Sequence, residues 1–249
     1  MKIVALNLDI QWKNPQENFK IIEVQFENIE ADLFLLPEMF TTGFCMEAND
    51  IADREDTTLN WMKSFAYQKQ AAICGTVSVK ENEHFYNRCY FVMPDGSSYY
   101  YNKRHLFSYS GEDKIYTPGS QRVIMSYKGV RFLLQICYDL RFPVFSRNKG
   151  DYDVVLYLAN WPQQRIEAWQ HLLKARAIEN QAIVFGVNRT GKDGNGLSYP
   201  ESTYAYHPSG ALISQQEDNL VMLDLDTADL QQFRAKYPFL KDADLFELK

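Results

Sequence analysis

The sequence lacks any long apolar run and any segment with the features of an export signal. Its first residues, MKIVALNLDIQWKNP, interrupt their apolar run at Asn7 and Asp9, and no small-residue cleavage site follows. No apolar stretch is long enough to span a bilayer. We therefore expect a cytoplasmic protein, whose thiols stay reduced, with no membrane as its partner.

Sequence patterns typical of metal sites and of disulfide frameworks are also missing. The four cysteines show no CxxC spacing, and the four histidines include no pair such as HxxxH. These spacings argue against a structural zinc site and against a disulfide framework. Positive charge is not in excess either, because the formal net charge is -6. An acidic chain gives no reason to expect nucleic acid as a partner.

No repeat, low-complexity tract or linker divides the 249 residues. Apolar periodicity and turn residues instead predict strands and helices that alternate to the end of the chain. We expect strands at 2–9, 32–38, 71–79, 86–93, 97–103, 122–127, 130–136, 153–160, 182–188, 202–207, 211–214 and 219–226, and helices at 15–30, 57–70, 144–150, 164–180 and 227–236. This order predicts one α/β domain over residues 1–249, with a mixed sheet and more than one layer of helix.

Cys137 is the first candidate for chemistry. It ends the apolar strand of LLQICYDLRFPVF and precedes a predicted helix, a placement that presents a side chain beside free backbone N–H groups. Such groups lower the pKa of a thiol or bind an oxyanion. A packed strand cysteine fits the same local pattern. Cys74 and Cys89 lie inside apolar strands, where packing in the core is the simpler interpretation.

Three charged residues have a functional and an ordinary interpretation. Glu38 follows the buried strand LFLLP, where partial burial suits a general base, but a solvated loop glutamate fits equally. Lys103 follows an aromatic strand and is either an oxyanion ligand or part of a basic surface cluster. Glu112 lies among other charged residues, which is typical of a solvent-exposed loop. His105 offers a rival base, because a Cys–His pair also activates a thiol.

Taken together, these segments resemble the nitrilase superfamily of carbon–nitrogen hydrolases over nearly the whole chain. The resemblance rests on a glutamate in LLPEMFTTGF, a lysine in YNKRHLF and a cysteine in ICYDLRFP, in this order, with NWP and HLLKARAIENQA further on. LPEMFTTGF, KRHLF, CYDLRFPVFSRN and ANWP are similar to the bacterial ω-amidase branch. The fold that this resemblance implies is a four-layer α-β-β-α sandwich.

The resemblance also implies a mechanism and an assembly. Glu38 is the expected base, Cys137 the nucleophile that forms a thioester, and Lys103 an oxyanion ligand together with the backbone N–H of Tyr138. Glu112 is expected to orient Lys103 or the substrate. No cofactor or metal is needed by this route. Relatives dimerise through the helix after the nucleophile and the ARAIEN helix, so we expect a homodimer or a larger homo-oligomer.

The implied substrate is a small 2-oxo acid amide, such as 2-oxoglutaramate or 2-oxosuccinamate, which requires a group that binds a carboxylate. Arg141 and Arg189 are candidates, although Arg141 could instead pair with Asp139, and Arg189 could brace the GKDGNG loop. Aromatic residues beside the catalytic segments are candidate pocket walls or core residues: Phe40, Phe44, Phe107 and Trp161.

Other functions stay open at this point. The same residues would serve hydrolysis of deaminated glutathione, an N-carbamoyl amine or a nitrile. A binding or scaffold protein on the same fold would keep an unreactive Cys137.

Overall fold

The computed structural model describes residues 1–247, and its largest sheet has seven strands. The order across this sheet is β13-β14-β1-β2-β3-β4-β5. β1, β2 and β3 are parallel, whereas the other neighbours are antiparallel. The strands are β1 (Lys2–Leu6), β2 (Leu33–Leu35), β3 (Ala72–Glu81), β4 (His84–Val92), β5 (Ser98–Asn102), β13 (Gln215–Glu217) and β14 (Leu220–Asp224).

A second sheet has five strands in the order β12-β9-β8-β7-β6. Its centre, β7 to β9, is parallel and its edges are antiparallel. The strands are β6 (Ile124–Tyr127), β7 (Val130–Ile136), β8 (Val154–Ala159), β9 (Ile183–Asn188) and β12 (Tyr204–Tyr206). A separate two-stranded ribbon, β10 (Gly191–Lys192) and β11 (Ser198–Tyr199), brackets the GKDGNG loop.

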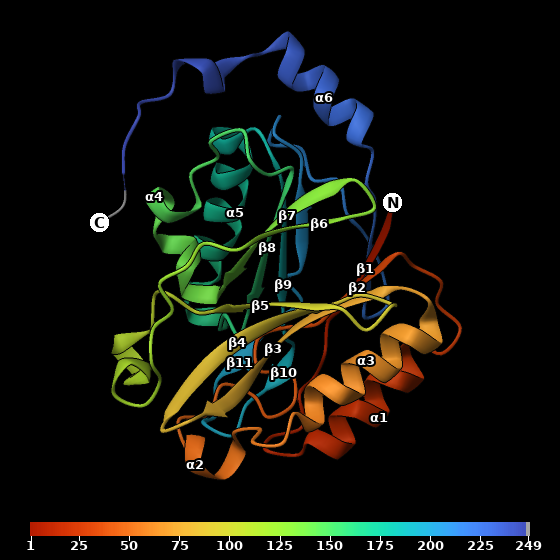
Figure 1. The fold of residues 1–249 in the computed structure, drawn as a ribbon, viewed down its shortest axis with the longest axis vertical. Coiled ribbons are helices and arrows are strands. Elements are labelled where there is room, and N and C mark those ends of the chain that lie inside the picture. The colour runs from red at the N-terminus through yellow and green to blue at the C-terminus, as the bar shows by residue number, and fades with distance from the viewer. Residues whose placement is uncertain (248–249) are drawn as a thin grey trace.

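Helices cover the outer face of each sheet (Figure 1). α1 and α3 lie together against the larger sheet, and α4 and α5 lie on the opposite side of the molecule. α6 and the chain that follows it run over one end. The helices are α1 (Pro15–Gln25), α2 (Ala48–Ile51), α3 (Thr57–Lys69), α4 (Pro143–Ser146), α5 (Ile166–Asn180) and α6 (Thr227–Lys236).

Three apolar interfaces separate these four layers. The central one joins inward-facing residues of both sheets, such as Leu35 of β2 and Phe132 of β7. A second packs α1 and α3 on the larger sheet, and a third packs α5 on the smaller one through Trp169 and Leu173. The predicted four-layer α-β-β-α fold is therefore confirmed. The assignment of 1–249 to one domain stays a prediction, since residues 248 and 249 lie outside the described range.

Several predicted boundaries differ from the structure for local reasons. Asn14 caps α1 as expected, because its Oδ1 accepts from the Glu17 N–H at 3.3 Å. The helix ends at Gln25 rather than near residue 30, and Lys69 of α3 donates to the carbonyls of Phe26 and Glu27 that follow. The predicted 202–214 hairpin forms only in part. An antiparallel bridge joins Tyr206 to Leu212, with the His207 N–H donating to the Ala211 carbonyl at 2.9 Å, but residues 211–214 form no strand and the ladder of β12 is with β9.

The ends of four strands converge at one place between the sheets. Glu38 follows β2 and Lys103 follows β5 in the seven-stranded sheet, whereas Cys137 follows β7 and Asn160 follows β8 in the five-stranded one. Carboxyl ends of parallel strands are where open α/β sheets place their sites. Within residues 1–247, no helix is both long and apolar enough to cross a membrane.

Candidate active site

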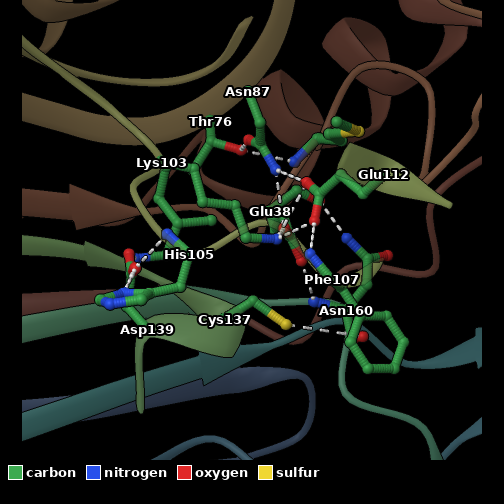
Figure 2. Close-up of polar contacts among 12 residues, drawn as sticks. Glu38, Thr76, Asn87, Lys103, His105, Phe107, Glu112, Cys137, Asp139 and Asn160 are labelled. Carbon is green, nitrogen blue, oxygen red and sulfur yellow. Dashed lines mark hydrogen bonds and ion pairs between the residues drawn. The ribbon is translucent and has the colours of Figure 1, made fainter. Parts of the chain in front are cut away.

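A buried charge cluster forms the centre of the candidate site (Figure 2). The Lys103 Nζ donates to Glu38 Oε1 at 2.8 Å and to the two carboxylate oxygens of Glu112 at 3.0 and 2.9 Å. All three side chains have no solvent exposure. Burial alone lowers the pKa of Lys103, but the charges of Glu112 and Glu38 outweigh it and raise this pKa above its ordinary value. The ammonium is therefore held charged inside the protein.

Glu112 belongs to this buried cluster and not to a solvent-exposed loop. Burial raises the pKa of its carboxyl group, and the charge of Lys103 opposes that rise. Its second oxygen also accepts from the backbone N–H of Phe107 at 2.6 Å. Glu112 thereby gives the Lys103 ammonium a second carboxylate partner besides Glu38.

Asn87 completes the cluster, although it was not among the predicted site residues. Its Nδ2 donates to Glu38 Oε1 at 2.8 Å and to Glu112 Oε1 at 3.2 Å. Its Oδ1 accepts from Thr76 Oγ1 at 2.9 Å, which fixes the orientation of the amide. The sequence gives little signal for this role, because Asn87 is one of two adjacent polar residues, with Arg88, in the strand YNRCYFVM.

Asn160 holds Glu38 from the other sheet. Its backbone N–H donates to Glu38 Oε2 at 2.9 Å, and its side-chain amide donates to the Glu38 backbone carbonyl. The carbonyl oxygen of Asn160 lies 3.9 Å from the Cys137 Sγ. One residue at the end of β8 thus contacts both the carboxylate and the thiol.

Cys137 directly follows β7 and is the first residue of the 3-10 turn Cys137–Arg141. Its φ is +43°, in the left-handed region that residues other than glycine rarely adopt. Burial raises the pKa of its thiol well above the ordinary value, the charge of Glu38 raises it further, and Lys103 acts in the opposite direction. Burial and the neighbouring Glu38 thus both favour the neutral thiol over the thiolate.

Asp139 holds the turn in place. Its carboxylate accepts from the Ile136 N–H at 2.9 Å, the Tyr101 hydroxyl at 2.8 Å and the His105 N–H at 3.0 Å. The His105 Nδ1 lies 2.7 Å from the same carboxylate. Figure 2 shows this histidine on the far side of the turn from the sulfur. The thiol thus has a carboxylate for a neighbour, whereas His105 is bound to Asp139.

A cavity of ≈ 270 Å³ opens over the thiol. Four of the five residues predicted to bind substrate line it: Phe44, Phe107, Arg141 and Trp161. Tyr138, whose backbone N–H was predicted to hold the oxyanion, lines it as well. Arg141 stacks over the Trp161 ring at 5.0 Å and does not pair with Asp139. A second guanidinium, Arg165, stacks over Phe107 at 5.1 Å. Arg165 was not among the predicted site residues, because it lies at the start of a helix and belongs to no motif.

Two predicted pocket residues lie elsewhere. Arg189 is fully buried, and its guanidinium donates to Asp9 at 3.1 Å and to backbone carbonyls. It stacks behind Tyr199 at 4.9 Å, and Tyr199 itself lines the cavity. Arg189 therefore braces the loop, which was the alternative interpretation. Phe40 packs in the core beneath Gly75.

Among residues 1–247, no group of three or more histidine, cysteine, aspartate or glutamate side chains is arranged to hold a metal ion.

The structure is a four-layer α-β-β-α sandwich that gathers a thiol, an ammonium and two carboxyl groups in one site between its sheets. The sequence identifies the family: a model of the carbon-nitrogen hydrolases matches residues 5–235, and the chain belongs to that family. It is thus a hydrolase of carbon–nitrogen bonds other than peptide bonds, and the predicted membership of the nitrilase superfamily is confirmed.

Relatives of known name cover the chain from end to end. The chain is 42% identical to omega-amidase YafV of Escherichia coli, covering 100% of this chain and 98% of the relative. It is 32% identical to 2-oxoglutaramate amidase of Bacillus subtilis, covering 96% of each. A crystal structure of a carbon–nitrogen hydrolase superfamily protein from Xanthomonas campestris, with an arsenic adduct in its active site, matches with a TM-score of 0.95 at 38% identity. That match covers 100% of this chain and 99% of the other.

Proposed function

We propose that the protein is an ω-amidase that hydrolyses the terminal amide of small 2-oxo dicarboxylic acid monoamides, such as 2-oxoglutaramate and 2-oxosuccinamate, to the acid and ammonia. Full-length similarity to an omega-amidase and to a 2-oxoglutaramate amidase supports this function. The observation that carries the chemistry is the buried Glu38–Lys103–Glu112 cluster beside Cys137 at the base of a small cavity.

In the proposed first half of the reaction, Glu38 takes the proton of the Cys137 thiol and the thiolate attacks the amide carbonyl carbon. Lys103 and the backbone N–H of Tyr138 hold the oxyanion that forms. The carbon–nitrogen bond then breaks as Glu38 returns the proton to the departing nitrogen, so ammonia leaves rather than an amide ion. A thioester with Cys137 remains.

In the second half, Glu38 takes a proton from water, and the hydroxide attacks the thioester carbonyl. The carbon–sulfur bond breaks, the sulfur regains its proton from Glu38, and the free acid leaves. Lys103 does not donate its proton in this scheme, because the neighbouring carboxylates keep its pKa raised. Glu112 keeps the ammonium pointed at the oxyanion position.

Ammonia release from 2-oxoglutaramate tests this function. The wild-type protein should release ammonia, and Cys137→Ala should release none while it keeps the wild-type melting temperature. A thioester should be visible by intact mass after rapid acid quench. Turnover by Cys137→Ala, or no ammonia from any 2-oxo acid amide, would contradict the proposal.

A substrate panel separates the related chemistries. It should contain 2-oxoglutaramate, deaminated glutathione, an N-carbamoyl amine and a nitrile, each at equal concentration. We expect the highest kcat/KM for the 2-oxo acid amide. Equal or faster hydrolysis of the carbamoyl amine would replace the ω-amidase assignment, and an absence of any covalent adduct would favour a binding protein.

We also propose a cytoplasmic homodimer that associates through α4 and α5. Two apolar side chains support this, because Val144 on α4 is 51% exposed and Ile178 on α5 is 47% exposed. The mechanism needs a reduced Cys137, in keeping with a cytoplasmic location. Light scattering should give a dimer mass for the wild type and a lower mass for the double variant Val144→Asp, Ile178→Asp.

A further inference from the structure

We propose that Tyr101 and His105 are positioning residues that act through the carboxylate of Asp139. Together these three residues form the Asp139 bracket, which fixes the Lys103 ammonium relative to the Cys137 thiol. The inference rests on the proposed function, because it explains how the oxyanion ligand and the nucleophile of that reaction are aligned. It also gives His105 a role without proton transfer.

The donors that reach Asp139 come from both sides of Lys103. Two residues before the lysine, the Tyr101 hydroxyl donates to Asp139 Oδ2 at 2.8 Å. Two residues after it, the His105 backbone N–H donates to Asp139 Oδ1 at 3.0 Å, and the His105 Nδ1 lies 2.7 Å from the same oxygen. The short segment that carries the ammonium is therefore fastened at both ends to one carboxylate.

Asp139 is also fastened to the turn that presents the thiol. It lies two residues after Cys137, and its Oδ2 accepts from the N–H of Ile136, the residue before Cys137, at 2.9 Å. The aspartate is fully buried, and hydrogen bonds from several donors make a charged carboxylate tolerable in such a place. One side chain thus joins the thiol turn of one sheet to the ammonium segment of the other.

The contacts of the His105 ring define its role. The oxygens of Asp139 accept from the surrounding N–H and O–H groups, so the Nδ1 that faces them carries a hydrogen. The other side of the ring stacks on Phe142, with ring centres 4.1 Å apart and planes inclined by 13°. Figure 2 shows the ring beyond the turn from the sulfur. His105 is therefore a donor to Asp139 and not a base for Cys137.

The hydrogen bonds of the Lys103 side chain, within residues 1–247, lead away from the thiol turn. Its Nζ donates to Glu38 and to Glu112. Asn160 links Glu38 to the thiol, because its backbone N–H and its carbonyl contact both groups. The Asp139 bracket supplies a corresponding link for the ammonium.

This link matters because oxyanion stabilisation depends on geometry. The donor must lie within hydrogen-bond distance of the position where the negative charge develops. A displacement of about 1 Å can lower a rate about 10²-fold. The bracket should therefore act on turnover, and substrate binding should change little when it is broken.

Two substitutions of His105 separate its hydrogen bond from its ring. His105→Phe keeps the stack on Phe142 and removes the Nδ1 donor, whereas His105→Asn loses the stack and keeps an N–H group close to the position of Nδ1. His105→Phe should lower kcat for 2-oxoglutaramate about 10- to 100-fold, the range for a hydrogen bond to a charged group, with KM nearly unchanged. His105→Asn should keep most of the wild-type kcat. Equal losses in the two variants would overturn the bracket and indicate a role for the ring itself.

Alkylation of Cys137 by iodoacetamide tests the alignment without an amide being hydrolysed. The charge of Lys103 lowers the pKa of this thiol, so an ammonium that moves away leaves less thiolate. His105→Phe and Tyr101→Phe should be alkylated about two- to tenfold more slowly than the wild type at the same pH, because a rise of one in the pKa lowers the thiolate fraction about tenfold. An unchanged rate would overturn the proposal, and so would a faster rate, which indicates an opened turn.

His84→Phe is the matched control. This histidine is exposed at the start of β4, and its Nδ1 lies 3.2 Å from Thr117 Oγ1. The substitution should change neither kcat nor the alkylation rate. Melting temperatures identify any variant that does not fold, and Tyr101→Phe tests the other arm of the bracket if His105→Phe is such a variant.

NMR of protein labelled with ¹⁵N-histidine keeps the two proposals separable. One ring signal, absent from His105→Asn, should show a hydrogen on Nδ1. A His105 ring with its hydrogen on Nε2 alone would overturn the bracket even where the wild type hydrolyses 2-oxoglutaramate. The Nδ1–H signal and the slower alkylation of the variants, without hydrolysis of any 2-oxo acid amide by the wild type, would instead overturn the proposed ω-amidase reaction.

Discussion

Replacing Glu38 by glutamine should have two opposite effects on Cys137. The carboxylate accepts the thiol proton in the proposed reaction, and its negative charge also raises the pKa of that thiol. Glu38→Gln removes both contributions and keeps the shape of the side chain. Turnover should therefore fall while the fraction of thiolate rises.

Each effect has an expected size. Loss of a general base costs about 10²- to 10⁴-fold in turnover. A carboxylate about 4 Å from a thiolate, at an effective dielectric constant of about 20, destabilises the thiolate by about 4 kcal/mol. Even about a third of this energy corresponds to about a tenfold larger thiolate fraction. Lys103 keeps Glu112 as a partner at 2.9 Å, so the ammonium stays charged in the variant.

Alkylation by iodoacetamide, followed by intact mass at pH 7, measures the thiolate directly. Cys45, Cys74 and Cys89 are buried, and Cys137→Ala supplies the background rate. Glu112→Gln is the matched control, because the charge of Glu112 contributes less to the thiol pKa than that of Glu38. A folded Glu38→Gln protein that alkylates no faster than the wild type would refute the electrostatic argument, and undiminished amide turnover would refute the assignment of the base.

Three other substitutions test the surroundings of the site. Asn87→Leu removes the amide that joins the two buried carboxylates, and turnover should fall at least about tenfold, with a lower melting temperature by calorimetry. Asp139→Asn places an N–H group where donors converge and should destabilise the protein by about 1–3 kcal/mol in urea unfolding. Burial raises the pKa of Asp153, but hydrogen bonds from Arg131 and Arg234 outweigh it and lower this pKa below 3.8, so its stabilising effect is present above pH 3.8 and is lost as pH falls further. Asp153→Asn should therefore melt lower than the wild type at pH 7, and an equal difference near pH 2 would contradict the assignment.

The sequence predicted those parts of the site that lie directly after a strand. Glu38, Lys103 and Cys137 each follow an apolar segment whose end is visible as a change from apolar to polar residues. Such an end fixes where a side chain emerges from a sheet, so the candidates could be named. Their meeting at one point depends on the packing of two sheets, which no local pattern specifies, and it was inferred from the family resemblance.

Residues whose position in the site depends on tertiary contacts could not be predicted from the sequence. Asn87 lies within β4, where alternation indicates only which face its side chain occupies, and its two carboxylate partners come from distant loops. Arg165 precedes α5, and nothing in the local sequence distinguishes it from other charged residues. Its contact with the Phe107 ring is made only in the folded protein. Arg189 shows the converse, since a basic residue next to a glycine-rich loop was a reasonable ligand but is buried against Asp9.

The site is divided between the two sheets in a way that has a physical consequence. The carboxylate of Glu38 and the ammonium of Lys103 follow strands of the seven-stranded sheet, whereas the thiol of Cys137 follows a strand of the five-stranded sheet. Their alignment rests on Asn160, whose backbone N–H holds Glu38 at 2.9 Å while its carbonyl lies 3.9 Å from the Cys137 Sγ. The carboxylate and the thiol therefore come together only when the apolar faces of both sheets are packed. A partly unfolded chain holds neither a buried ammonium nor an aligned base, so reactivity at Cys137 is coupled to folding of the whole sandwich.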